Sequence, residues 1–294
     1  MEKKKKPMEK FGRGASSSRS ERESRGEAAL RRTSEQAATP PQKKELPEDV
    51  VVGRNAVTEA LKSGRTVNRL LVAEHDEQGS IREIIKLARE GGALVESVPR
   101  SQIEAIAKGF RHQGVIAYTS PVEYTPLEEI LDAARKKEKA PFLVLLDELE
   151  DPHNLGAVIR TADAVGADGV LIPKRRSCPL SATVAKTSAG AVEYVPVARI
   201  GNVAQTIREL KQEGFWIVGA DMDGTTDYFA ADLTGALVLV IGSEGRGVSR
   251  LVRENCDLLV KIPMQGKINS LNASVAGAIL MYESLRQRRE RGKS

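Results

Sequence analysis

The chain is predicted to be an α/β protein with a C-terminal parallel sheet, preceded by a smaller α/β unit and a basic tail. Two observations predict this class. Short apolar runs alternate with amphipathic helical segments from residue 50 to the C-terminus, as in βα units that build a parallel sheet. The first 48 residues are rich in Lys, Arg, Glu, Ser, Pro and Gln and nearly lack aliphatic side chains. Such a segment cannot bury enough apolar surface to offset its ordering entropy, so we expect residues 1–48 to be disordered.

Charge and composition narrow the function classes. Residues 1–48 carry 13 Lys and Arg against 8 Asp and Glu, which equals the net charge of +5 for the whole chain. The tail is therefore either a solubilising segment or an arm that binds nucleic-acid phosphates. No apolar run reaches 18 residues and the charged N-terminus has no apolar segment behind it, so we expect neither a membrane span nor a secretory signal. Cys178 and Cys256 fit no metal spacing, and we expect no metal, no disulfide framework and a cytoplasmic location.

The first folded unit is expected over residues 50–124. VVGRNAVTEALKSG predicts a short strand, a glycine turn and a helix. In the helix expected over 80–92, Ile81, Ile84, Ile85 and Ala88 share one face, and Gly91 ends it. The remaining elements expected here are strands at 69–74, 93–99 and 114–120 and a helix at 101–109.

A linker with a charged helix is expected at 125–140, and the second unit at 141–294. FLVLLD (142–147) is a continuous apolar run, typical of a parallel strand buried on both faces. The elements expected after it are helices at 154–166, 181–190, 202–214, 248–254 and 271–289, and strands at 169–173, 192–197, 215–221, 236–242 and 257–263.

Three loops in the second unit combine small residues with hydrogen-bonding side chains. VLVIGSEGRGVS (238–249) leaves an apolar strand through three glycines. It lacks the Lys-Ser/Thr pair of a Walker loop, and its glycine spacing differs from the dinucleotide fingerprint. A tight turn would explain the glycines alone. It would not explain Glu244, a carboxylate among small residues.

The other two loops are also ambiguous when each is taken alone. In IPMQGKINSLNAS (262–274), Ser270, Asn272 and Ser274 lie where the last helix begins, and a single helix cap needs only one of them. In NLGAVIR (154–160), Asn154 could be a cap. Arg160 has apolar neighbours in sequence, which predicts either a salt bridge or an RNA or catalytic contact.

Together, in this order, the three loops resemble the motifs of the SpoU class of RNA ribose methyltransferases in the SPOUT superfamily, over about residues 141–290. The resemblance implies S-adenosylmethionine as cofactor, an obligate homodimer and a deep trefoil knot in the C-terminal domain. It implies methylation of a ribose 2′-hydroxyl in RNA without a metal. The residues it implies are, for catalysis, Asn154, Arg160, Glu244, Ser270 and Asn272, and for the cofactor, Gly242, Ile262, Leu271 and Ser274.

The first unit resembles the RNA-binding module that precedes the catalytic domain in 23S rRNA guanosine 2′-O-methyltransferases. GRNAVTEAL (53–61) matches its opening and RHQGVIAY (111–118) its end. This resemblance favours rRNA over tRNA as substrate. The alternatives are a tRNA 2′-O-methyltransferase of the same family and a non-catalytic RNA-binding protein that retains the fold.

Overall fold

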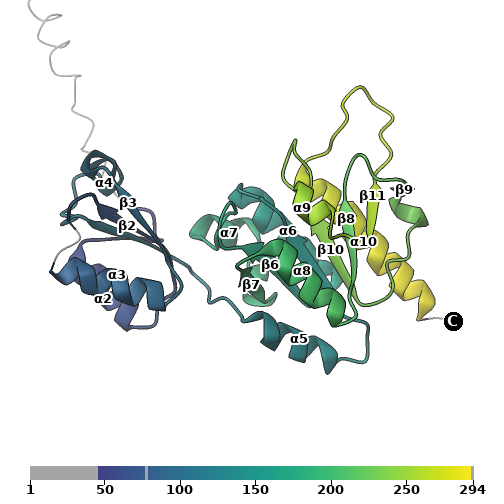
Figure 1. Ribbon diagram of the computed structural model, residues 1–294, viewed down its shortest axis with the longest axis horizontal. Helices are drawn as coiled ribbons and strands as arrows, with labels where there is room; N and C mark the ends of the chain where they lie inside the picture. Colours follow the sequence, from purple (N-terminus) through teal and green to yellow (C-terminus); the bar gives the residue numbers. More distant parts are fainter. Residues whose placement is uncertain (1–45, 77–78, 293–294) are drawn as a thin grey trace, which may run out of the picture. The chain divides into compact units, whose positions relative to one another are not determined.

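Two β-sheets organise the described part of the protein, a computed structural model that describes residues 46–76 and 79–292 (Figure 1). The tail predicted over residues 1–48 lies outside these ranges except for its last three residues. Within the described ranges no helix is both long enough and apolar enough to cross a bilayer.

The smaller sheet is mixed and has helices on both faces. Its four strands run in the order β1-β4-β2-β3, with β2 and β3 parallel and the other pairs antiparallel. Figure 1 shows α2 and α3 on one face of this sheet and α4 on the other. Val57 of α2 and Ile84 of α3 are buried in one core, and Ile103 of α4 in another. The elements are β1 Val50–Val52, α2 Arg54–Lys62, β2 Val67–Ala73, α3 Ser80–Glu90, β3 Leu94–Val98, α4 Arg100–Ala107 and β4 Val115–Thr119.

The larger sheet is parallel, as the sequence predicts. Its strands run in the order β7-β6-β5-β10-β8-β11-β9, and every neighbouring pair is parallel. All strands therefore end at the same edge. The elements are α5 Leu127–Arg135, β5 Phe142–Leu146, α6 Pro152–Val165, β6 Gly169–Pro173, α7 Ala182–Thr187, η1 Ala191–Glu193, β7 Val197–Ile200, α8 Val203–Gln212, β8 Trp216–Ala220, β9 Thr226–Asp227, η2 Tyr228–Ala230, β10 Leu237–Ile241, α9 Arg250–Arg253, β11 Leu258–Lys261 and α10 Ala273–Arg291.

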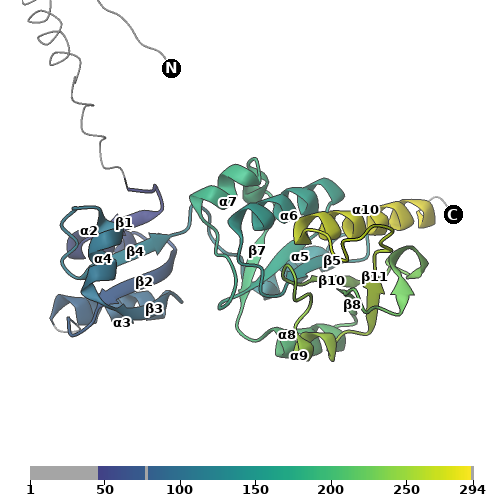
Figure 2. The same ribbon diagram turned by 90° about the horizontal axis from the view of Figure 1, so that it is seen from above.

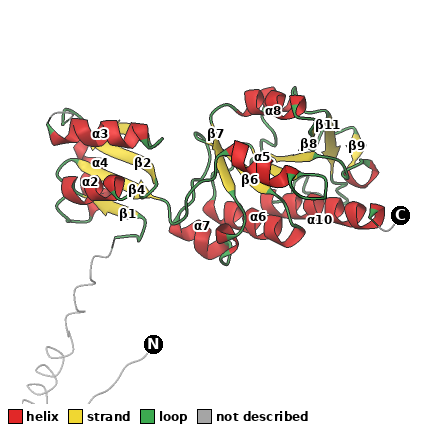
Figure 3. Cartoon of the chain, turned by 90° about the horizontal axis from the view of Figure 1, so that it is seen from below, coloured by secondary structure: helices red, strands yellow, loops and turns green. Residues whose placement is uncertain are grey.

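Each central strand of this sheet contributes to two cores because successive side chains point to opposite faces. In β5, Phe142, Val144 and Leu146 pack with α6, α7 and α10, whereas Leu143 and Leu145 pack with α5 and α8. Figures 2 and 3 show α6, α7 and α10 along one side of the sheet and α8 on the other. All five residues of β5 are buried, which explains the unbroken apolar run.

The prediction of a strand at 192–197 is wrong. Residues 191–193 form a 3₁₀ turn, Tyr194 is 80% exposed, and β7 begins only at Val197. The main-chain nitrogens of Tyr194 and Val195 both donate to the Ala191 oxygen at 3.0 Å, which holds this segment in a turn before the edge strand β7 begins. The last helix begins at Ala273 and not at 271, since Asn272 is its N-cap.

Arg288 of the C-terminal helix α10 contacts the edge of the larger sheet at which β5 and β10 begin, opposite the edge at which the strands end. The Arg288 guanidinium donates to the carbonyl oxygens of Ala140 and Gly235, both at 2.6 Å, and lies 5.1 Å from the centre of the Phe142 ring. Burial lowers the pKa of Arg288. This side chain therefore satisfies main-chain carbonyls from segments 53 and 148 residues earlier in the chain.

Candidate active site

A cavity of about 740 Å³ lies at the carboxyl ends of three neighbouring strands, β10, β8 and β11. Its volume falls in the range of pockets for small molecules and cofactors. The loops that follow these strands line it, which is where open α/β sheets bind ligands. Of the cofactor residues predicted from the sequence, Gly242, Ile262 and Leu271 line this cavity, as does Ser270 from the catalytic set.

Gly242 occupies a position that only glycine can fill. It follows the last residue of β10, and a Cβ built on it would overlap the carbonyl group of Gly247 and the main-chain nitrogen of Val248. Ser243 and Gly247 exchange two main-chain hydrogen bonds of 3.0 Å, which close the loop on itself. Gly247 has a φ of +65°, a left-handed conformation that favours glycine. The glycines therefore form a tight turn that also borders the cavity, so the turn and the ligand-site interpretations of this motif are compatible.

Three polar side chains, one from each motif, meet beside the cavity. The Asn154 amide nitrogen donates to Glu244 Oε1 at 2.8 Å, and the Asn272 amide nitrogen donates to Asn154 Oδ1 at 2.9 Å. The Asn272 amide also donates to Glu244 Oε1. We call Asn154, Glu244 and Asn272 the polar cluster. It joins residues up to 118 positions apart in sequence.

The helix-cap explanation applies to one member of the polar cluster and fails for another. Asp151 caps α6 by accepting from the main-chain nitrogen of His153 at 3.0 Å, so Asn154 is not the cap. Asn154 is 5% exposed and points its amide at Glu244. Asn272 does cap α10, because its Oδ1 accepts from the main-chain nitrogens of Ser274 and Val275.

Two predicted residues lie away from the cavity lining. The Ser274 hydroxyl donates to Asn272 Oδ1 at 2.6 Å and supports the cap. Arg160 is exposed on α6 and makes no ion pair or hydrogen bond with any described residue. The salt-bridge interpretation of Arg160 is therefore wrong for the described chain. Its apolar neighbours in sequence face the core, while Arg160 lies on the outer face of the same helix.

The sequence analysis missed a set of charged residues on the cavity wall. Asp221, Asp223 and Arg253 line it, and Arg253 pairs with both carboxylates at 2.7 and 3.4 Å. Asp221 Oδ2 is buried and accepts no hydrogen bond of good geometry from any described residue, although Arg253 lies close enough for an ion pair. Their position in the sequence was a signal that could have been used. Asp221 directly follows β8, at the sheet edge where the loop after β10 already indicated a ligand site.

The donor set of the cavity suits S-adenosylmethionine. A buried carboxylate oxygen without a hydrogen-bond donor can accept from a ligand ammonium or hydroxyl group. Main-chain groups of the three loops, together with the side chains of Ile241, Ile262 and Leu271, offer hydrogen-bonding and apolar surface. The cavity therefore offers a carboxylate for an ammonium or hydroxyl group and apolar surface for a flat heterocycle, and S-adenosylmethionine carries all of these groups.

The two cysteines are poor candidates for nucleophilic catalysis. Burial raises the pKa of the Cys178 and Cys256 thiols to about 12, which disfavours a nucleophilic thiolate. Among the described side chains, no group of three or more His, Cys, Asp or Glu is placed to hold a metal ion.

Two family models match the chain. The model described as SpoU rRNA Methylase family matches residues 141–282, and that described as RNA 2′-O ribose methyltransferase substrate binding matches residues 50–125. A relative from Bacillus subtilis, named as a TrmH family tRNA/rRNA methyltransferase, is 49% identical over 245 residues. That match covers 83% of this chain and 98% of the relative. A Staphylococcus aureus relative of the same family name is 48% identical over 248 residues, covering 84% of this chain and the whole of the relative.

Solved structures agree with these matches. The SpoU methyltransferase AviRb from Streptomyces viridochromogenes, crystallised with S-adenosylmethionine, is similar with a TM-score of 0.53 and 26% identity. The similarity covers 82% of this chain and 90% of that protein. An rRNA methyltransferase from Sinorhizobium meliloti, also with S-adenosylmethionine, is similar with a TM-score of 0.52 and 28% identity over 81% of this chain and 86% of that protein.

Proposed function

Because the chain belongs to the SpoU family of S-adenosylmethionine-dependent RNA methyltransferases, we propose that it methylates a ribose 2′-hydroxyl in rRNA. A guanosine of 23S rRNA is the proposed target. The observation that carries the proposal is the polar cluster of Asn154, Glu244 and Asn272 beside the cavity at the ends of β10, β8 and β11. The proposal assigns the cavity to the cofactor and the amides of the polar cluster to orienting the ribose.

The division of labour between the two units supports an RNA substrate. We assign RNA recognition to residues 50–124 and catalysis to residues 141–294, with residues 125–140 as linker. The match of residues 50–125 to an RNA 2′-O-ribose methyltransferase substrate-binding model supports the first assignment. The curated relatives carry names that include both tRNA and rRNA, so tRNA is the competing substrate. An RNA substrate also favours the cytoplasmic location, which stays a prediction.

In the proposed mechanism the protein positions the ribose and stabilises charge. S-adenosylmethionine, when bound, supplies a methyl group already activated by its sulfonium. Arg160 lies outside the cavity lining of its own chain and has no partner among the described residues, so the homodimer proposed below would have to bring it to the cavity of the partner protomer. There it would bind the target phosphate and stabilise negative charge developing on the 2′-oxygen. It would not remove the hydroxyl proton, because a guanidinium is effectively always protonated. As the 2′-oxygen takes the methyl group from the sulfur, its proton would pass to solvent water. Asn154, Asn272 and Ser270 would orient the ribose or Arg160, and Glu244 fixes both amides of the polar cluster.

We propose that the chain acts as a homodimer whose C-terminal part forms a trefoil knot. Exposed apolar side chains support the dimer: Val275 and Tyr282 of α10 are 48% and 52% exposed, and Ile268 in the preceding loop is 73% exposed. Large exposed apolar groups in one region are typical of an interface. The single hydrogen bond from the Asn272 amide to Glu244 joins the segment before α10 to the loop after β10, the two segments that such a knot would bring together. Light scattering after size-exclusion chromatography tests the dimer.

The function is tested by supplying RNA and cofactor together. Purified protein is incubated with methyl-labelled S-adenosylmethionine and with either rRNA or tRNA from cells that lack this gene. We expect label in 23S rRNA at one guanosine, resistant to alkaline cleavage at its 3′ side because the 2′-oxygen is blocked. Label in tRNA alone would replace the rRNA proposal with the tRNA alternative. Cofactor binding without transfer to any RNA would favour the non-catalytic alternative.

A further inference from the structure

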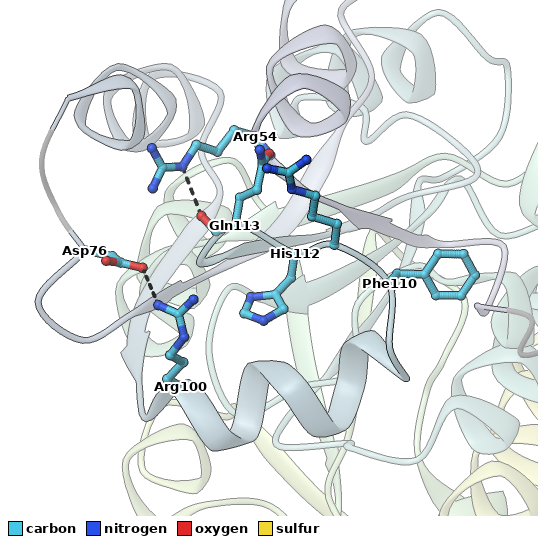
Figure 4. Close-up of a pocket in the computed structure, with 7 residues that line it drawn as sticks. Arg54, Asp76, Arg100, Phe110, His112 and Gln113 are labelled. Carbon is cyan, nitrogen blue, oxygen red and sulfur yellow. Dashed lines mark hydrogen bonds and ion pairs between the residues drawn. The ribbon is translucent and has the colours of Figure 1, made fainter.

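A second cavity, of about 560 Å³, lies in the first unit and gathers positive charge (Figure 4). Arg54, Arg100 and Arg111 line it, with Asp76 as its one carboxylate. These residues come from the starts of α2 and α4 and from the loop that precedes β4. We call this cavity the arginine pocket. It has no part in the cofactor site described above.

The arginines stand where helix electrostatics opposes them. Arg54 and Arg100 are the first residues of α2 and α4, and neither helix has an acidic residue in its first turn. A helix N-terminus carries partial positive charge, so a cation there is unfavourable. By contrast, α3 and α5 place Glu83 and Glu128 in their first turns. Fold stability alone does not favour the arrangement in the arginine pocket, whereas a bound anion would neutralise it.

The available partners leave most of this charge uncompensated. Arg100 pairs with Asp76 at 3.3 Å and with Glu104 at 3.6 Å, both in exposed surroundings. Arg54 Nε donates to the main-chain oxygen of Gln113 at 3.0 Å, which fixes its direction but adds no negative charge. Arg111 has no ion-pair or hydrogen-bond partner within residues 46–76 and 79–292.

The loop at the pocket is held in a demanding conformation. Gln113 has a φ of +50°, which is uncommon for a residue with a side chain, and Gly114 follows with a φ of +82°. Hydrogen bonds hold it: the main-chain nitrogen of Arg54 donates to Gln113 Oε1 at 3.2 Å, and that of Gly114 donates to His112 Nδ1 at 3.1 Å. The second bond leaves the proton of a neutral His112 on Nε2, where it can serve as a donor.

Phe110 adds a feature that a simple anion site does not need. Phe110 is 44% exposed. Aromatic residues make up only 4% of the chain, so few rings are available to contact a ligand. Figure 4 shows its ring at the margin of the pocket, pointing away from His112 and Arg100. An exposed aromatic ring at the margin of a pocket lined by guanidinium groups can stack an unpaired base outside the pocket while the phosphate is held within it.

We propose that the arginine pocket binds one phosphodiester of the substrate RNA through Arg54, Arg100 and Arg111, with the adjoining unpaired base stacked on Phe110. The inference rests on the proposed RNA substrate. It predicts that the first unit holds an unpaired nucleotide, with binding that depends on salt through the arginines and on an aromatic ring through Phe110.

The test uses the full chain and a fluorescein-labelled, twelve-nucleotide single-stranded RNA of mixed sequence, with fluorescence anisotropy over a salt series. Arg111→Gln should weaken binding about tenfold, as expected for loss of a charged hydrogen bond. It should also reduce the slope of log affinity against log salt by about 0.7, the value for one phosphate contact on a single strand. Arg89→Gln is the matched control, since it removes an exposed arginine from the far end of α3.

Phe110→Ala tests the stacking half. Affinity should fall about 5- to 100-fold with no change in salt slope, and Phe110→Trp should restore it. Equal binding by the Arg111, Phe110 and Arg89 variants would overturn the proposal, as would failure of the unmodified chain to bind the RNA. Competition by a ten-glutamate peptide as strong as by unlabelled RNA would identify an acidic-protein site instead.

Two controls separate folding and the proposed enzyme function from the pocket. Thermal unfolding of Arg111→Gln should match or exceed that of the unmodified chain, because a repulsive charge near two helix N-termini is removed. S-adenosylmethionine binding, measured by calorimetry, should be unchanged in every pocket variant. If the unmodified chain does not bind S-adenosylmethionine, that result would count against the proposed function and not against the arginine pocket.

Discussion

The cavity of the larger sheet and the arginine pocket of the smaller unit are built in opposite ways. The cavity is built mainly from loops that follow adjacent parallel strands, with Gly242 allowing a turn that no side chain could enter. The arginine pocket is built from long charged side chains brought together from residues 54, 100 and 111. The first suits a ligand of one fixed shape. The second suits a repeating anion that can be held in any sequence context.

The same difference decides how far each site could be predicted from sequence. The cavity residues Gly242, Ile262 and Leu271 lie in short contiguous motifs, so the spacing of residues along the chain is enough to mark them. Arg54, Arg100 and Arg111 are scattered among 45 Lys and Arg, and nothing local distinguishes them. Only the fold shows that two of them begin helices at one cavity.

Fold elements follow the same rule. Buried strands such as β5 and β10 form unbroken apolar runs in the sequence and were predicted within a residue or two. β9 was missed because its two residues cannot show a periodicity. The salt-bridge alternative for Arg160 fails because sequence neighbours on a helix need not be spatial neighbours: Val158 and Ile159 are buried while Arg160 is exposed.

The largest expected effect tests whether the cavity depends on main-chain shape. Gly242→Ala forces a methyl group into the main chain at Gly247 and Val248. We expect cofactor affinity to fall at least about 100-fold and the free energy of unfolding to drop by about 1–3 kcal/mol. Calorimetry and denaturant unfolding measure both. Gly201→Ala is the control, because Gly201 also follows a strand and a Cβ there meets nothing within 4 Å. Equal cofactor affinity in the two variants would contradict the shape argument.

Substitution of Arg160 tests whether this exposed arginine of the catalytic unit affects the rate of methyl transfer. The alternative is that it affects only RNA affinity, which is the role proposed for the arginines of the arginine pocket. Arg160→Ala should lower methyl transfer about 10²- to 10³-fold at saturating RNA and leave the melting temperature nearly unchanged. Arg160→Lys keeps the charge but loses the planar fork, and should remain impaired. Single-turnover rates measure this, with Arg208→Ala on α8 as control. Full turnover by the Arg160→Ala variant at saturating RNA would show that Arg160 contributes only to RNA binding and not to the reaction.

The polar cluster separates capping from catalysis. Asn272→Asp keeps the oxygen that caps α10 but replaces the amide donor with a second carboxylate beside Glu244. We expect activity to fall about 10- to 100-fold through misplacement of the cluster. Asn202→Asp is the matched control, because Asn202 caps α8 by accepting from the main-chain nitrogen of Gln205 at 3.1 Å. Its activity should be unchanged and its stability altered by less than about 0.5 kcal/mol. Similar activities for the two variants would reduce Asn272 to a cap.

The smallest effect concerns groups outside both sites. Burial raises the pKa of Cys178 and Cys256 from 9.0 to about 12, and that of Tyr124 from 10.0 to about 12. A raised pKa in the folded state gives stability that is complete below the unfolded value and is lost as pH rises towards the folded value. Stability should therefore decline from about pH 9 to pH 12, and both thiols should react slowly with a thiol reagent at pH 8. Rapid modification at pH 8 would show that the thiols are accessible.

The Arg288 contacts have a consequence for how the chain is made. The ribosome releases β5 and β10 well before it releases Arg288. The carbonyl oxygens of Ala140 and Gly235, where these strands begin, therefore have no Arg288 donor until the end of synthesis. The catalytic unit therefore completes its hydrogen bonding only after α10 has emerged. A premature stop that removes the last turns of α10 would take the Arg288 donor from those carbonyls and uncover the Phe142 ring, although every strand of the sheet would still be made.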